Sequence, residues 1–150
     1  MAKEKKESFV NTANTRPGVY DAVIKDIAEK KVCPFCPEQL ANFHKNPILI
    51  EKKYWLATDS MYPYTNAKNH ILFVHKNHLE HFSDLSKEAR EELWEIAEEC
   101  LSLKKMAGGT LLMRFGDTRY TGASVNHLHA HIICGDPEKE KREIVLARVG

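Results

Sequence analysis

Three histidines stand at alternate positions near the C-terminal end of the chain, in the stretch SVNHLHAHIICGD. In a β-strand, His127, His129 and His131 would share one face, and the apolar residues between and after them would point into the core. Each buried imidazole then needs water or a hydrogen-bond partner. A structural role explains one such histidine easily, but it explains three in register poorly, so the pattern indicates a functional site.

Three kinds of chemistry use closely spaced histidines. The metallohydrolase pattern His-x-His-x-Asp-His requires a carboxylate two residues after its second histidine, and this chain has His131 there. A cupin-like metal site requires a further histidine downstream, and none follows His131. The third possibility is a nucleophilic histidine with helper groups, since imidazole is neutral and nucleophilic near pH 7.

A second group of reactive side chains is the pair in Cys33-Pro-Phe-Cys36. It is compatible with a redox pair, half of a zinc site, a disulfide or two unrelated thiols. A thioredoxin-like motif follows a strand, whereas a predicted helix precedes this pair. Zinc takes four ligands of the thiolate and imidazole type. Because the sequence has no second Cys-x-x-Cys, histidines would have to complete such a site.

The elements that must position these groups follow from the apolar pattern. Residues 47–59 resemble a β-hairpin around Glu51-Lys52-Lys53, and residues 69–75 and 110–117 form short apolar strands. Residues 86–106 predict the clearest helix, with Ser86 as its N-cap and Gly108-Gly109 ending it. This order of elements predicts an α+β fold with a mostly antiparallel sheet.

The two ends of the chain carry weaker patterns. Residues 1–16 are rich in Lys, Glu, Asn and Thr and predict a flexible N-terminal arm. Residues 17–150 then form a single domain. A helix begins near Pro17, with an apolar stripe that consists of Val19, Val23, Ile24 and Ile27. The last apolar run, at residues 143–149, predicts an edge strand or a tail.

Length and composition limit the class of protein. The 150 residues are 43% hydrophobic and 29% charged, which is typical of one soluble globular domain. A net charge of +1 gives no reason to expect binding to nucleic acid or to an anionic membrane. The polar start has no signal-peptide pattern and no apolar run reaches 18 residues, so we expect no membrane association and a cytoplasmic location.

The histidine stretch resembles the signature of the histidine triad superfamily, His-φ-His-φ-His-φ-φ with φ apolar, which HLHAHII matches without a gap. The preceding GASVN is similar to the Gly-x-Ser-Val that leads into the triad in many members. AKNHILFVHKNHLEHFSDL resembles an upstream strand and turn of the family, with His75 where proline is common. The likeness covers residues 33 to about 136. The asparagine that the family often has near Gly116 is absent.

This resemblance implies an antiparallel sheet meander with helices packed on it, and two protomers that pair their sheets in a homodimer. It implies a nucleotide hydrolase or nucleotidyl transferase in which His129 attacks the α-phosphorus and forms a nucleotidyl-histidine intermediate. His131 would bind a phosphate oxygen, His70 would lie near the phosphate, and Ser124 would donate its hydroxyl. Dinucleoside polyphosphates and nucleoside phosphoramidates are the substrate classes it suggests. The alternative is a non-catalytic nucleotide-binding regulatory protein of the same fold.

The resemblance also assigns the cysteine pair to a structural zinc site. In several branches of the superfamily, two histidines complete such a site, and they correspond to His78 and His127 here. His75 and His81 lie close enough in sequence to replace His78 as the ligand. A site closed by four protein ligands leaves no position for water, so this zinc would stabilise the fold rather than react.

For three further residues the sequence gives little indication of a functional role. Arg114 and Arg119 flank the loop before the triad and would suit an anionic group, although such arginines are often simply solvated. His44 has no assigned role and is expected at the surface.

Overall fold

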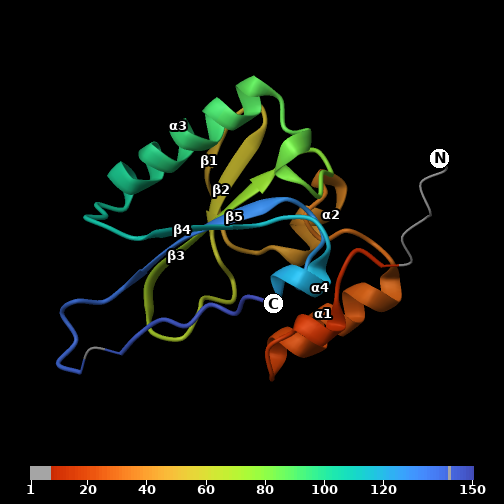
Figure 1. Ribbon diagram of the computed structural model, residues 1–150, viewed down its shortest axis with the longest axis horizontal. Coiled ribbons are helices and arrows are strands. Elements are labelled where there is room, and N and C mark those ends of the chain that lie inside the picture. The colour runs from red at the N-terminus through yellow and green to blue at the C-terminus, as the bar shows by residue number, and fades with distance from the viewer. Residues whose placement is uncertain (1–7, 142) are drawn as a thin grey trace.

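A five-stranded antiparallel sheet in the order β1-β2-β3-β5-β4 forms the centre of the protein (Figure 1). The computed structural model describes residues 8–141 and 143–150. The strands are β1 (Ile48–Glu51), β2 (Trp55–Asp59), β3 (Ala67–His75), β4 (Thr110–Arg114) and β5 (His129–Gly135). The first three strands follow one another as a meander, and β5 then lies between β3 and β4. The predicted α+β class with an antiparallel sheet is confirmed.

The long helix α3 (Lys87–Leu103) covers one face of this sheet. Ser86 caps it as predicted, since its side chain accepts a hydrogen bond from the backbone N–H of Ala89. The main core lies between α3 and the sheet, and alternate residues of the strands supply its other half. Its largest fully buried members are Trp55, Phe73, Ile71, Ile96 and Leu128.

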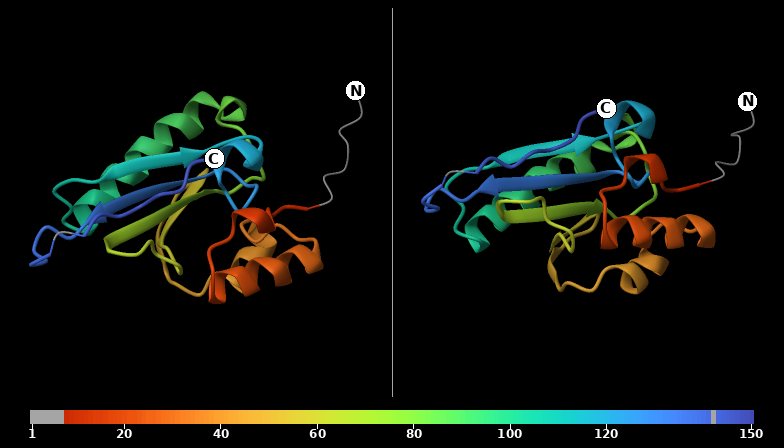
Figure 2. Two further views of the ribbon diagram at one scale, coloured as in Figure 1. Left: turned by 60° about the horizontal axis from the view of Figure 1, so that its bottom comes forward. Right: turned by 90° about the horizontal axis from the view of Figure 1, so that it is seen from below.

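The opposite face of the sheet carries the N-terminal helices α1 (Val19–Lys30) and α2 (Pro37–Phe43), as both views in Figure 2 show. Ile24 and Ile27 of α1 pack with Val10 and Val125 in a second apolar cluster. The short helices η1 (Thr12–Asn14), η2 (Phe82–Asp84) and α4 (Thr118–Thr121) lie in the connections. On this side of the sheet, His129 and His131 of β5 line a pocket together with residues of α1.

The N-terminal arm predicted over residues 1–16 falls partly outside the described residues. From residue 8 onward, the chain is packed against the domain. Val10 is buried and forms a β-bridge with Val125, and the Asn14 side chain donates to the carbonyl oxygens of Thr118 and Ala123. The packed part of the chain therefore begins before residue 17, because these polar and apolar anchors hold it.

Two local predictions need correction, and the structure decides a third that was left open between an edge strand and a tail. Val19 does not belong to the apolar stripe of α1, since its side chain is 74% exposed at the first residue of the helix. Helix α3 ends at Leu103 rather than at Gly108-Gly109, because Lys105 takes a left-handed conformation with φ 50°. Residues 143–150 form a tail without strand pairing, which the Asn66 side chain and Arg114 hold by hydrogen bonds to the carbonyl oxygens of Ile144 and Arg148.

No helix in the described part of the chain combines the length and the apolar character that a membrane span requires.

Candidate functional site

The three histidines of the triad are all buried, but they face two different surroundings. His129 and His131 belong to β5 and point away from α3. His127 lies in the bend just before β5. Its ring faces the cysteine pair instead of the pocket. The structure therefore divides the histidine motif between a site for chemistry and a site for a metal.

His129 is held in one orientation and one tautomer. Its Nδ1–H donates to the carbonyl oxygen of His127 at 2.5 Å, so the lone pair of a neutral ring lies on Nε2. The side chain is only 6% exposed. Burial lowers the pKa of His129 to about 4, and this outweighs the hydrogen bond to the carbonyl. The ring is therefore neutral, with an unprotonated Nε2, at neutral pH.

The hydrogen bonds of His70 determine which ring nitrogen of His131 carries the proton. The backbone N–H of Tyr64 donates to His70 Nδ1 at 3.1 Å, so a neutral His70 carries its proton on Nε2. That Nε2–H donates to His131 Nδ1 at 2.9 Å. Burial lowers the pKa of His70 to about 4 and that of His131 well below its usual value, so both rings are neutral.

This chain of hydrogen bonds leaves the proton of His131 on Nε2. Among the described residues, His131 Nε2 is the one buried side-chain nitrogen or oxygen without a hydrogen-bond partner. An unpaired buried donor is costly unless a ligand satisfies it. His131 therefore offers an N–H group that suits an oxyanion.

Ser124 is paired with a tyrosine that sequence analysis missed. Its hydroxyl forms a short hydrogen bond with the Tyr20 hydroxyl of α1. Burial raises the pKa of Tyr20, against the effect of the Ser124 hydrogen bond. Tyr20 therefore stays protonated, and the two hydroxyls can pass a proton between them.

One pocket connects these groups. Its wall includes all four residues expected near the phosphate, namely His70, Ser124, His129 and His131. The other wall comes from the N-terminal segment and includes Arg16, Tyr20, Ile24 and Phe35. His44 also lines the pocket and bonds the Thr58 hydroxyl at 2.8 Å, so it is not the surface residue that we expected.

The two candidate arginines behave differently. Arg114 is 9% exposed and lines the pocket, and it pairs with His129 across the β4–β5 ladder. The side chain of Arg119 is 78% exposed and forms an ion pair with Asp117 outside the pocket wall. Only Arg114 is placed to bind an anionic group beside His129.

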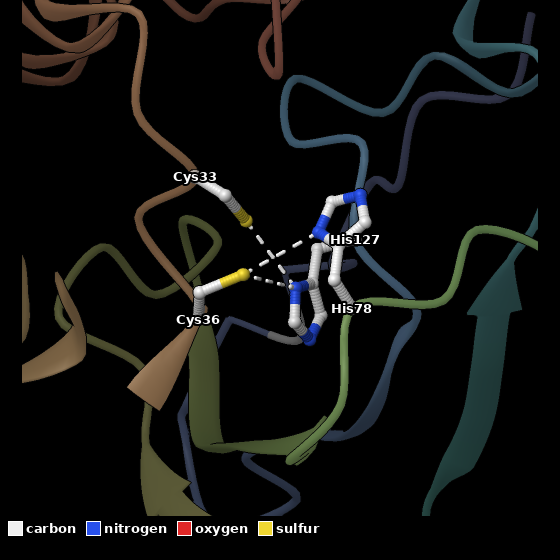
Figure 3. Close-up of side chains that lie close together, drawn as sticks. All are labelled: Cys33, Cys36, His78 and His127. Atoms are coloured by element: carbon white, nitrogen blue, oxygen red, sulfur yellow. Dashed lines mark hydrogen bonds between the residues drawn. The ribbon is translucent and has the colours of Figure 1, made fainter. Parts of the chain in front are cut away.

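The cysteine pair and two histidines converge on a single point, as Figure 3 shows. One ligand atom from each of Cys33, Cys36, His78 and His127 lies within 4.8 Å of every other. The Nδ1 atom of His127 is 3.3 Å from Cys33 Sγ and 3.8 Å from Cys36 Sγ, and the Nδ1 atom of His78 is 3.5 Å from Cys36 Sγ. Tetrahedral zinc with its usual bond lengths separates a sulfur and a nitrogen ligand by about 3.5 Å.

The outer nitrogens of both imidazoles are also arranged as in a metal site. His127 Nε2–H donates to the carbonyl oxygen of His75 at 2.6 Å, and His78 Nε2 lies 3.5 Å from a carboxylate oxygen of Glu80. Such oxygen partners fix a ligand histidine with its other nitrogen free for the metal. His75 and His81 point elsewhere, because their Nδ1 atoms bond to Asn77 and Ser83. The residues present therefore fit a zinc ion.

The two thiols of the cluster differ in acidity. Burial tends to raise the pKa of Cys33, but hydrogen bonds from His127 and His78 outweigh it and lower that pKa to about 6. Burial, together with the nearby Cys33, raises the pKa of Cys36. Without a cation only one thiol of the pair ionises near neutral pH, whereas a bound metal ion would deprotonate both.

Phe35 joins the two sites through direct contact. It lies between the two cysteines, and its ring packs edge-on against His129 at 5.1 Å and against His127 at 6.0 Å. The segment that supplies two candidate metal ligands therefore also forms a wall for the reactive ring. Sequence analysis missed Phe35, Tyr20 and Tyr64, because aromatic residues in helices and turns give no signal before their partners are known.

Comparisons with known proteins agree with this geometry. The family model of the HIT domain matches residues 44–138. A hypothetical histidine triad nucleotide-binding protein from Sulfolobus tokodaii strain7 is 25% identical, with a TM-score of 0.57 over 71% of each chain. No curated protein sequence matches the chain.

Two more distant structures share the fold. A HIT family hydrolase from Clostridium thermocellum is 23% identical, with a TM-score of 0.55 over 73% of this chain and 95% of that one. A zinc-bound histidine triad family protein from Mycobacterium smegmatis is 17% identical, with a TM-score of 0.57 over 75% of this chain and 81% of that one. Since the family model covers well over half of the chain and contains the three triad histidines, the chain belongs to the HIT domain family.

Proposed function

We propose that this protein is a nucleotide hydrolase or nucleotidyl transferase that acts on the α-phosphate of nucleotide conjugates. One observation carries the proposal: His129 donates its Nδ1 proton to the His127 carbonyl and so presents an unprotonated Nε2. The pocket that contains this ring also holds an unpaired N–H donor on His131. Dinucleoside polyphosphates and nucleoside phosphoramidates are the substrate classes that we propose.

In the first step, His129 Nε2 attacks the α-phosphorus. A nitrogen–phosphorus bond forms, and the bond from phosphorus to the leaving group breaks with its electron pair on the leaving group. The ring becomes cationic, and its Nδ1–H bond to the His127 carbonyl oxygen strengthens. His131 Nε2–H donates to a phosphate oxygen and stabilises the charge that develops there.

The leaving group needs a proton as it departs, and the Tyr20–Ser124 hydroxyl pair is the source that we propose. The pair is then left with one proton fewer. In the second step, the oxygen of water or of another acceptor attacks the phosphorus, a phosphorus–oxygen bond forms, and the bond to His129 Nε2 breaks with its electron pair on that nitrogen. The Tyr20–Ser124 pair takes the proton that the acceptor loses, so both the pair and His129 return to their starting protonation states.

We also propose that Cys33, Cys36, His78 and His127 hold a structural zinc ion. The bound ion would neutralise the two thiolates and fix the bend that contains His127. Support comes from the ligand spacing and from the oxygen partners of the two imidazoles. The zinc that the Mycobacterium smegmatis relative contains is in line with this assignment.

The deciding experiment measures turnover of a diadenosine polyphosphate and of adenosine phosphoramidate by wild type, His129→Ala and His81→Ala. His81 is a suitable control because its ring lies outside the pocket wall, against Phe82 and Phe115. We expect His129→Ala to lose at least 1,000-fold in kcat with an unchanged melting temperature and zinc content, and His81→Ala to keep turnover.

Intact-mass measurement of wild type after rapid quenching should show one added nucleotidyl group, which His129→Ala lacks. Nucleotide binding without turnover of either substrate would contradict the proposal. That result would favour the alternative, a nucleotide-binding regulatory protein.

A further inference from the structure

We propose that Arg16 and Arg114 form a second anion-binding subsite beside the attacked phosphate, which selects substrates whose leaving group carries further negative charge. A terminal or bridging phosphate is the chemical group that would fit. This inference rests on the proposed function and narrows it, because it favours polyphosphate conjugates over phosphoramidates with an uncharged amine.

Arg114 is a buried cation without an acidic partner. It forms no ion pair with any described residue. Its hydrogen bonds go to neutral oxygens: Nε to the Thr121 carbonyl at 3.1 Å, and Nη2 to the Tyr64 hydroxyl at 3.0 Å and the Arg148 carbonyl at 2.7 Å. A guanidinium that is taken out of water without a counter-charge is costly. These contacts fix the position of the Arg114 guanidinium but do not neutralise its positive charge, which a bound anion could do.

Arg16 lines the same pocket from the N-terminal segment, and it forms no ion pair with any described residue. Its guanidinium packs 4.8 Å from the centre of the Tyr20 ring and 5.0 Å from that of Tyr64. It donates to the carbonyl oxygens of Tyr62 at 2.7 Å and Pro63 at 3.4 Å. Tyr64 therefore contacts both cations, one through its ring and the other through its hydroxyl.

Both arginines have unused donors toward the described residues. A guanidinium has five N–H groups. Arg16 uses two of them and Arg114 uses three, which leaves three and two, respectively. Arg114 Nη1 in particular makes no hydrogen bond with a described residue. Guanidinium forks of this kind match phosphate oxygens in geometry as well as in charge.

The rest of the pocket supplies no negative charge to balance these cations. No Asp or Glu occurs among its described lining residues, whereas three arginines do: Arg16, Arg114 and Arg148. The positive field also reaches the catalytic rings, since both Arg16 and Arg114 help to lower the pKa values of His70 and His131, after burial. A ligand that neutralises this wall must therefore bring its own negative charge.

The position of the arginines indicates which part of the substrate they contact. Arg114 lies opposite His129 on the neighbouring strand, so it is close to the attacked phosphorus. Arg16 lies across Tyr64 from Arg114. A second phosphate attached to the attacked one would reach between the two guanidiniums, whereas an amine leaving group would leave Arg16 unneutralised.

The test compares the binding of AMP and of α,β-methylene-ADP by isothermal titration calorimetry. The analogue adds one phosphate and cannot be cleaved between its phosphorus atoms. The variants are Arg16→Gln and Arg114→Lys, with Arg119→Gln as a matched control because that arginine is exposed and outside the pocket wall. Thermal melting checks that each variant is folded.

We expect the analogue to bind wild type and Arg119→Gln at least tenfold more tightly than AMP. In Arg16→Gln and Arg114→Lys this preference should fall below threefold, while the AMP affinity of Arg16→Gln stays within threefold of wild type. Equal affinities of wild type for AMP and the analogue would overturn the subsite, and so would a preference that survives in Arg16→Gln.

If neither nucleotide binds, the proposed function itself has failed, and inorganic tripolyphosphate then tests the subsite alone. Binding of tripolyphosphate that weakens at least tenfold in Arg16→Gln would support the subsite. An affinity unchanged by Arg16→Gln, or no binding to wild type, would overturn it.

Discussion

His127 Nδ1 lies 3.3 Å from the sulfur of Cys33, while the carbonyl oxygen of the same residue accepts the Nδ1 proton of His129. The side chain of His127 thus belongs to the metal cluster and its main chain to the reactive ring. Any displacement of the His127 backbone changes the orientation of His129, because a hydrogen bond of 2.5 Å leaves little freedom.

Loss of the metal should therefore lower activity as well as stability. We expect Cys36→Ser to lose bound zinc, to melt at a lower temperature and to lose about 10- to 100-fold in turnover, the range typical when metal-site support is removed. Metal analysis, thermal melting and kinetics on one preparation would check this. Cys134→Ser is the control, since Cys134 lies outside the cluster at the end of β5. A metal-free variant with wild-type turnover would contradict the link.

The His70–His131 pair predicts different results for two substitutions of His70. His70→Gln keeps an N–H donor for His131 Nδ1, whereas His70→Leu leaves that buried acceptor unpaired. We expect His70→Leu to lower the free energy of unfolding by roughly 1–3 kcal/mol and kcat by about 10- to 100-fold. His70→Gln should lie closer to wild type in both. Urea unfolding and steady-state kinetics decide this, and equal losses in the two variants would show that the hydrogen bond from His70 to His131 Nδ1 is not what matters.

The low pKa of His70 predicts acid sensitivity with a defined sign. An unfolded histidine titrates near pH 6.5, while burial lowers the pKa of folded His70 to about 4. Between these values the unfolded chain binds a proton that the folded chain does not, so stability is complete above pH 6.5 and falls as the pH drops toward 4. The slope for this residue is at most about 1.4 kcal/mol per pH unit.

Urea unfolding of wild type and His70→Gln at pH 7, 6 and 5 measures that slope. Zinc loss in acid affects both proteins, so the difference between them isolates His70. Wild type should lose more stability than His70→Gln between pH 7 and 5. Parallel curves would show that His70 titrates normally.

Gly122 predicts a coupling between the C-terminal tail and the pocket. It has φ 72°, and an added Cβ would lie 3.3 Å from the Arg148 carbonyl oxygen, the atom that also accepts from Arg114. Gly122→Ala should cost roughly 1 kcal/mol in stability and raise KM several-fold, as the tail moves away from Arg114. Gly108→Ala is the control, because an added Cβ there meets nothing within 4 Å. An unchanged KM in Gly122→Ala would contradict the coupling.

We expect the homodimer that the family resemblance implies to use the β4 edge of the sheet. Among the described strands, β4 has β5 as its one neighbour, and Leu111 on it is 40% exposed. An exposed strand edge with apolar side chains favours pairing with a second copy. Light scattering should give roughly 34 kDa for wild type, twice the 17.2 kDa of one chain, and Leu111→Asp should shift it toward the monomer. A monomeric wild type would contradict the dimer.

The sequence was sufficient to predict the strands of the sheet and the long helix, because their apolar periodicity is local. It also predicted which histidines to examine, since alternation and the Cys-x-x-Cys spacing are visible along the chain. It could not predict that Arg114 is buried, because that depends on Tyr64 and Arg148, which lie 50 and 34 residues away. The role of Tyr20 could not be predicted for the same reason, because its partner Ser124 lies 104 residues away.

The C-terminal end of α3 was also predicted wrongly, for a local reason. The glycine pair looked like a helix stop, yet Lys105 adopts the left-handed conformation earlier in the chain. Local hydrogen bonds close the helix there, from the Lys105 N–H to the Ser102 carbonyl oxygen at 3.2 Å and from the Met106 N–H to the Leu101 carbonyl oxygen at 2.9 Å. The left-handed position of this motif usually carries glycine, so a lysine there gives no signal in the sequence.

The HIT match begins at residue 44, so residues from both sides of this border form the pocket and the Cys/His cluster. The matched region, residues 44–138, includes His70, His129 and His131, whereas Arg16, Tyr20 and Phe35 precede it. The proposed reaction would thus use residues of the family domain, while the residues proposed to recognise the rest of the substrate lie in the segment before it. Two of the four candidate metal ligands lie on each side of that border, so a bound ion would cross-link the segment before the family domain to the strand region that carries the reactive histidine.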